Sequence, residues 1–231
     1  MILDTIGTLV IGGALAALLA TITSTLAAPL VWRITLAALG GAWVSLVVGA
    51  IAAGDGNSPA IFVSFAVPIL GIGLCAALSR ASRTAIMSIP ATAIIGLNVV
   101  RVLGVDFLLL VSDGRLAGPF PFSAGIGDII TGLAAVPVAV LASRTSLRDP
   151  RIMVWNAFGA LDLLAAVVLG VGSRNGSPLQ FIHAGVGSDG FANLPWALVP
   201  LVLVPLFLIG HVIVFAHAAS EPRTSTRPAM A

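Results

Sequence analysis

Seven long apolar stretches alternate with short polar segments along the 231-residue chain. Each stretch holds about 20 residues with almost no charge, enough for a helix to cross the roughly 30 Å hydrocarbon core of a bilayer. The segments between them, such as GDGNSP and SDGRLAGPFP, are rich in the Gly, Pro, Asn and Asp typical of turns. The stretches lie near residues 5–27, 34–53, 60–79, 86–111, 124–143, 152–171 and 195–218.

This pattern predicts an all-α fold, a seven-transmembrane helical bundle over residues 1–219, followed by a polar, disordered tail at 220–231. No alternating ten-residue pattern indicates a barrel, and lipid excludes other backbone arrangements. The first stretch lacks a basic leading region and is too long for a signal peptide, so we expect it to be retained. Five prolines fall within the predicted spans and are expected to kink them: Pro68, Pro90, Pro137, Pro200 and Pro205.

The arginines gather at alternate ends of the predicted spans. One side of the bundle receives Arg33, Arg80, Arg83, Arg144, Arg148, Arg151, Arg223 and Arg227. The other side receives only Arg115 and Arg174. Because basic loops stay in the cytoplasm, we predict an N-terminus outside and a C-terminus in the cytoplasm. Trp32, Trp155 and Trp196 fall at predicted span ends, where tryptophan anchors helices at the interface.

Composition excludes several classes of protein. The chain is 58% apolar and 9% charged, whereas a soluble domain carries about 25% charged residues. Its arginines are scattered rather than clustered, so we expect no nucleic-acid partner, and the lipid bilayer is the expected surrounding. The chain has no lysine, which excludes a retinal Schiff base. We predict no cofactor and no metal site, since no paired-histidine or cysteine motif is present.

Seven polar residues interrupt the apolar stretches. Each charge at mid-bilayer costs about 2.5–3.5 kcal/mol on insertion scales, so packing alone does not explain these residues. They are expected to face the interior of the bundle, to pair there, and to form the substrate- or ion-binding site. The candidate residues are Asn98, Arg101, Asp106, Asp128, Asn156, Asp162 and His211.

Depth along each span predicts which of these residues meet. Arg101 and Asp162 each lie ten residues from a span end, about 15 Å deep, so they form the expected ion pair. Asp128 lies only four residues into its predicted span, and we expect it near the outer end, level with Asp106. His211 is expected to lie level with Asn156.

The charges of these residues do not balance. Three carboxylates face one guanidinium, so the interior holds a net charge of −2 unless protons, water or a cation compensate. We therefore interpret the chain as a small-solute or proton/cation-coupled transporter with a buried Arg/Asp site open to the outer side. One alternative is a membrane subunit or sensor whose ion pairs are structural. Another is an intramembrane enzyme or haem-binding protein, although no catalytic constellation is present.

Two further features bear on assembly and access. Gly41, Ser45 and Gly49 share one helix face, and such small-residue faces allow close approach of a second copy in a homo-oligomer. Residues 172–194 are long for a connection in a bundle, so they are a candidate lid over its mouth.

Three segments carry a resemblance to a known family: NVVRVLGVDFLLLVSDGRL, FPFSAGIGDIITGLAA and WNAFGALDLLAAVVLG. They resemble a widespread group of uncharacterised bacterial polytopic integral membrane proteins. Arg101, Gly127, Asp128, Asn156 and Asp162 fall at the signature positions of that group, as does His211. The resemblance implies a multi-pass location in the bacterial cell (inner) membrane.

Overall fold

The computed structural model describes residues 2–53 and 59–222, and no strand occurs within these ranges. The predicted all-α class is confirmed. The expected turn at 54–58 and most of the expected disordered tail lie outside the described residues. The elements are α1 (Ile2–Thr25), α2 (Leu30–Ala52), α3 (Pro59–Leu78), α4 (Arg80–Met87), α5 (Ala91–Leu97), the 3₁₀ segment η1 (Asn98–Gly104), α6 (Val105–Ser112), α7 (Pro119–Ala142), α8 (Pro150–Gly172), the 3₁₀ turn η2 (Asp189–Ala192), the π-helical turn η3 (Val199–Leu203) and α9 (Val204–Ser220).

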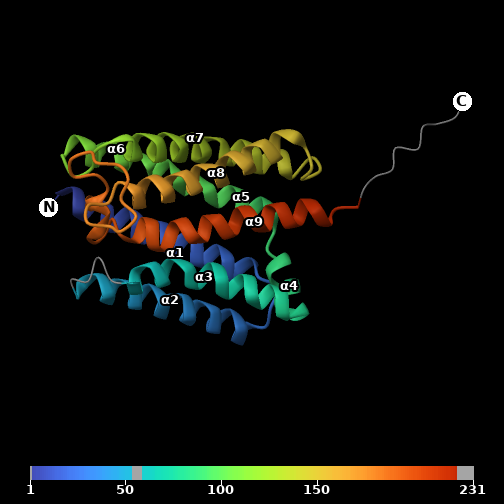
Figure 1. Ribbon diagram of the computed structural model, residues 1–231. Coiled ribbons are helices and arrows are strands. Elements are labelled where there is room, and N and C mark those ends of the chain that lie inside the picture. Colours follow the sequence, from blue (N-terminus) through green and yellow to red (C-terminus); the bar gives the residue numbers. More distant parts are fainter. Residues whose placement is uncertain (1, 54–58, 223–231) are drawn as a thin grey trace, which may run out of the picture.

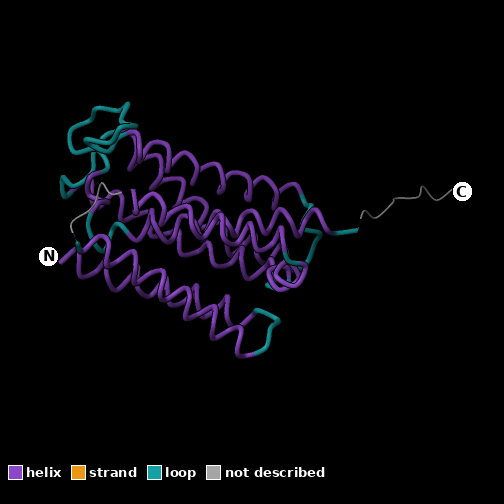
Figure 2. Tube along the Cα trace, turned by 60° about the horizontal axis from the view of Figure 1, so that its bottom comes forward, coloured by secondary structure: helices purple, strands orange, loops and turns teal. Residues whose placement is uncertain are grey.

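The long helices run side by side as one elongated bundle (Figure 1). The connections 113–118 and 173–198 gather at the end where α1 begins, which we name the loop end (Figure 2). Helix α9 finishes at the opposite end, the tail end, where the short helix α4 lies across the bundle. Helix α7 packs against η1, α8, α5 and α6, and α8 packs against α9, while α2 lies at the edge and is largely uncovered.

Six helical segments of the described chain are long and apolar enough to cross a membrane. Helix α3 together with α4 makes a seventh candidate, but the pair bends by 116° between Leu78 and Arg80. The central segment Ala91–Ser112 is one of the six, although η1 interrupts its α-helical winding. Several long apolar helices thus indicate a multi-pass membrane protein.

The bend between α3 and α4 has local causes. Ser79 caps α4 by accepting a hydrogen bond from the amide of Ser82 at 3.1 Å. Arg83 folds back and donates to the carbonyls of Ala76 and Ala77, which end α3. Residues 86 and 87, expected to begin the fourth span, therefore belong to α4.

Pro90 lies at the N-cap of α5 rather than within a span, so the expectation of a kink there is wrong. A proline lacks the amide hydrogen and clashes with the preceding turn, and the chain accommodates it by starting a new helix. By contrast, Pro68 and Pro137 lie inside α3 and α7 as expected.

Buried apolar side chains form two separate clusters, one in the loop-end half of the bundle and one in the tail-end half. The sequence order along α8 shows the division: Trp155 belongs to the tail-end cluster and Leu163 to the loop-end cluster. The same order holds along α9, where Phe207 and Val214 belong to different clusters. The layer between the two clusters holds these buried polar residues: Asn98, Arg101, Asp128, Thr131, Asn156 and His211.

The loop end is tied to α1 through Asp4. Its carboxylate accepts hydrogen bonds from Arg115 Nη1 at 2.6 Å and from Trp196 Nε1 at 2.9 Å. Trp196 is completely buried, and Trp155 donates to the carbonyl of Thr131, so neither is the interface anchor expected from sequence. Within the expected lid, Phe191 is buried in the loop-end cluster.

Candidate functional site

Arg101 is the centre of the buried polar layer, and its side chain is 1% exposed. Its Nη2 donates to Asp162 at 2.6 Å, so the ion pair expected from depth is present. Its Nε donates to Asp128 at 2.6 Å, which makes a second ion pair at a different nitrogen of the guanidinium. Its Nη1 donates to the carbonyl of Gly159 at 3.1 Å. One arginine therefore links η1, α7 and α8.

His211 extends this cluster to α9. Its Nε2 lies 3.1 Å from Nη1 of Arg101, and its Nδ1 lies 2.8 Å from Oδ1 of Asn156. An arginine nitrogen only donates, so Nε2 accepts and the ring hydrogen of the neutral histidine is on Nδ1, which donates to Asn156. Asn156 in turn donates to the carbonyl of His211 at 3.1 Å. The expectation that His211 and Asn156 lie at one level is met.

Asp128 lies deeper than the sequence indicated, and its expected position near the outer end is wrong. Helix α7 begins at Pro119, not near residue 124, because proline is well tolerated in the first turn of a helix. Asp128 is therefore nine residues inside the span and reaches Arg101. Asp106 lies in the first turn of α6, five residues after Arg101 in the same central segment.

Two glycines allow these side chains to come so close. A Cβ on Gly127 would lie 1.8 Å from Oδ1 of Asp162, and a Cβ on Gly159 would lie 2.6 Å from the ring of His211. Neither distance is possible for a real side chain. The glycines at these positions therefore belong to the site as much as the charged residues that they accommodate.

We expect Gly127→Ala to displace Asp162 from Arg101 and to lower the free energy of unfolding by about 3 kcal/mol, the upper part of the range for overpacking. Thermal unfolding in detergent micelles measures the effect. Gly13→Ala is the matched control, since a Cβ there meets nothing within 4 Å. Equal unfolding temperatures for the two variants would contradict this account.

Two polar atoms of this layer have no hydrogen-bond partner among the described residues: Oδ1 of Asn98 and Oγ1 of Thr131. Asn98 donates only from its other amide atom, to the carbonyl of Ile94 at 3.0 Å. Thr131 is completely buried one turn after Asp128 on α7, and sequence reasoning missed it because threonine is common in membrane helices. Most buried polar atoms in proteins have a hydrogen-bond partner, so these two atoms are exceptions.

A small cavity borders the charged cluster. It measures about 30 Å³, which exceeds the space that one water molecule needs. Arg101, Asp106 and Asp128 line it together with apolar residues that include Phe191 and Trp196. Phe191 and Trp196 belong to the loop end, so the cavity lies on the loop-end side of the charged cluster. Within residues 2–53 and 59–222 no group of three or more His, Cys, Asp or Glu residues is arranged to hold a metal ion.

The fold and the site together define an all-helical protein whose apolar helices surround a buried arginine–carboxylate–histidine cluster. The chain belongs to the family described as domain of unknown function DUF8737, whose model matches residues 58–218. The matched residues include all seven candidate residues and omit α1 and α2. No curated protein and no solved structure matches the chain.

Proposed function

We propose that this protein is a proton- or cation-coupled carrier of a small solute in the bacterial inner membrane, with its central site open to the outer side. The observation that carries the proposal is the charge of the cluster. Asp128 and Asp162 both lie 2.6 Å from one guanidinium, and His211 adds no charge. Two carboxylates against one arginine leave a net −1 that a proton or a cation has to balance.

The geometry supports a site that exchanges this ion. The cluster lies near mid-span, because Arg101 is ten residues from Ala91 and eleven from Ser112. The 30 Å³ cavity gives Asp128 a neighbouring space on the loop-end side, with Asp106 on its wall. We identify the loop end with the outer side of the membrane, since it carries only Arg115 and Arg174 among the described arginines outside the spans.

The proposal includes seven spans, an outer N-terminus and a cytoplasmic C-terminus. Counting α3 with α4 as one span gives seven, which agrees with α1 beginning and α9 finishing at opposite ends of the bundle.

The proposal also includes a homo-oligomer that forms through α2, where a Cβ on Gly41 or Gly49 would meet nothing within 4 Å. Such a face accepts a second helix at close range.

The second candidate is a membrane subunit or sensor whose ion pairs only hold helices together. It is favoured by the number of bonds that Arg101 makes, because four hydrogen bonds join its side chain to α7, α8 and α9. The two functions differ in one respect. A carrier site has to gain and lose an ion, whereas a structural cluster keeps one state.

We expect the unfolding temperature of the purified protein to vary with pH between about 5 and 9, and this dependence to be largely lost in Asp162→Asn. The variant retains one carboxylate for one guanidinium, so it needs no further ion. A thermal-shift series over this pH range, in uncharged detergent, measures both proteins without any knowledge of the solute.

Asp149→Asn is the matched control for this series. Arg151 beside Asp149 lowers the pKa of that carboxyl to about 2, so Asp149 does not titrate in the range measured. The control should keep the pH profile of the unsubstituted protein. If Asp162→Asn keeps it as well, Asp162 exchanges no proton and proton coupling through this cluster is contradicted.

A further inference from the structure

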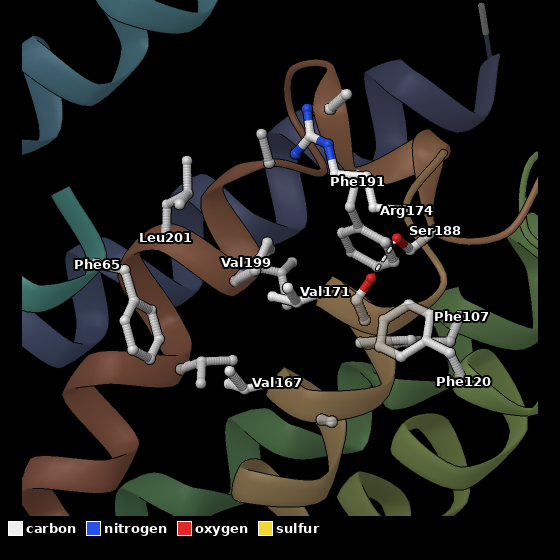
Figure 3. Close-up of a pocket in the computed structure, with 16 residues that line it drawn as sticks. Phe65, Phe107, Phe120, Val167, Val171, Arg174, Ser188, Phe191, Val199 and Leu201 are labelled. Atoms are coloured by element: carbon white, nitrogen blue, oxygen red, sulfur yellow. Dashed lines mark hydrogen bonds between the residues drawn. The ribbon is translucent and has the colours of Figure 1, made fainter. Parts of the chain in front are cut away.

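A second and larger cavity lies in the loop-end half of the bundle, among α3, α8, η2 and η3 (Figure 3). Its volume is about 150 Å³, and its walls are almost entirely apolar. None of the seven residues of the polar site lines it. Phe107 and Phe191, whose rings lie 4.9 Å apart, border both this cavity and the small one, so they form the wall between them.

The cavity reaches the surface of the bundle along α8. Ala166 and Gly170 line it from successive turns of that helix, and both are only half-buried. The surface of α8 faces lipid in the proposed arrangement, so a hydrocarbon chain can enter from the side. The size of the space limits what enters, because a dry cavity of about 150 Å³ accommodates a benzene-sized group of about six carbons.

One positive charge stands at the edge of this apolar space. Arg174 lies two residues beyond the end of α8 and lines the cavity, and its guanidinium is at the margin of the side chains drawn in Figure 3. Burial lowers the pKa of Arg174, and the carboxylate of Asp189 opposes that effect. A partly desolvated cation next to an apolar cavity complements a ligand that has an anionic group at the end of a hydrocarbon chain.

The loop over the cavity is held in place by specific bonds. Ser188 donates from its hydroxyl to the carbonyl of Gly170 at 2.6 Å, as the dashed line in Figure 3 shows. Phe191, three residues later, packs against Phe120 and Phe107 in the cavity wall. The loop-end side of the cavity is therefore covered by a positioned segment.

We propose that this cavity binds a single-chain carboxylic acid, with its carboxylate against Arg174 and about six carbons of its chain in the apolar space. The cavity volume favours one chain over the two chains of a phospholipid. The polar cluster takes no part in this binding, so the inference stands whether or not the protein is a carrier.

The test is equilibrium dialysis of radiolabelled decanoate against the full chain in phosphatidylcholine nanodiscs, with empty nanodiscs as the blank. We expect saturable binding. Arg174→Gln should weaken decanoate binding at least about tenfold and leave decanol binding unchanged, since the alcohol has no charge to pair. Arg174→Lys should restore most of the decanoate affinity, because it restores the positive charge.

Substitutions that fill the cavity test the proposal independently. Ala166→Leu should weaken both decanoate and decanol, whereas Ala165→Leu, on a neighbouring residue that does not line the cavity, should weaken neither. The inference is overturned by decanoate binding no greater than the blank, by unchanged decanoate affinity in Arg174→Gln, or by equal effects of the two leucines. Displacement of decanoate by an equimolar amount of phosphatidylglycerol would also overturn it, since the occupant would then be a phospholipid.

Discussion

Replacing Arg101 by methionine is expected to lower the free energy of unfolding by about 3–5 kcal/mol, the cost of leaving buried charges without their partner. The substitution leaves Asp128 and Asp162 facing each other across the space that the guanidinium held. It also removes the donor to Nε2 of His211 and to the carbonyl of Gly159. Unfolding in detergent micelles, followed through Trp155, whose ring lies 5.6 Å from that of His211, measures the loss.

Neutralising both carboxylates in the same chain should recover most of that stability. The triple variant Arg101→Met, Asp128→Asn, Asp162→Asn leaves no charge at the three positions that form the ion pairs, and amides cost far less than carboxylates without a counter-charge. Arg151→Met serves as the matched control, because Arg151 pairs with Asp149 at an exposed position and its loss should be barely measurable. If Arg101→Met is as stable as Arg151→Met, the guanidinium does not hold the cluster together.

The Arg101–Asp162 pair could be predicted from sequence because depth alone decides it. Each residue lies ten positions from the end of an apolar stretch that runs in the same direction, and lipid leaves a buried charge few alternatives to pairing. The helical class followed from the length of the same stretches. Both predictions rest on the bilayer, whose thickness converts residue counts into distances.

The partner of Asp128 could not be predicted in this way, because depth depends on where a helix begins. The segment PFPFS looks like part of a turn, since it contains two prolines after a glycine. In the structure these residues form the first turn of α7, which moves Asp128 five positions deeper. The direction in which each helix turns its side chains could not be predicted either. Nothing in the sequence therefore indicated that Nε2 of His211 contacts Arg101 rather than a carboxylate.

The positions of two tryptophans could not be predicted from the sequence either. Trp155 and Trp196 lie near helix ends, where the sequence favours an interface position, yet each is buried because its indole N–H has a specific acceptor, Thr131 and Asp4 respectively. Trp196 meets Asp4 across 192 positions of the sequence. Contacts of that range come from packing and leave no local signal.

Asp162→Asn is expected to separate function from stability. In proteoliposomes that contain a trapped pH dye and carry an imposed potassium diffusion potential, we expect ion movement through the variant to fall at least about tenfold, because the exchanging charge is gone. Its unfolding free energy should remain within about 1 kcal/mol of that of the unsubstituted protein. Asp113→Asn, an exposed carboxylate at the loop end, is the matched control and should change neither quantity.

The expected loss of ion movement without a large loss of stability follows from the shape of the site. Asparagine is nearly isosteric with aspartate, so it fits beside Gly127 and its oxygen still accepts from Nη2 of Arg101. The remaining pair, Arg101 with Asp128, is neutral and needs no proton or cation. A purely structural cluster predicts the reverse outcome, in which Asp162→Asn loses a charge-assisted bond worth about 1.5–3 kcal/mol and leaves any transport unchanged. Measuring both quantities on one variant therefore distinguishes an ion-exchanging site from a structural ion pair.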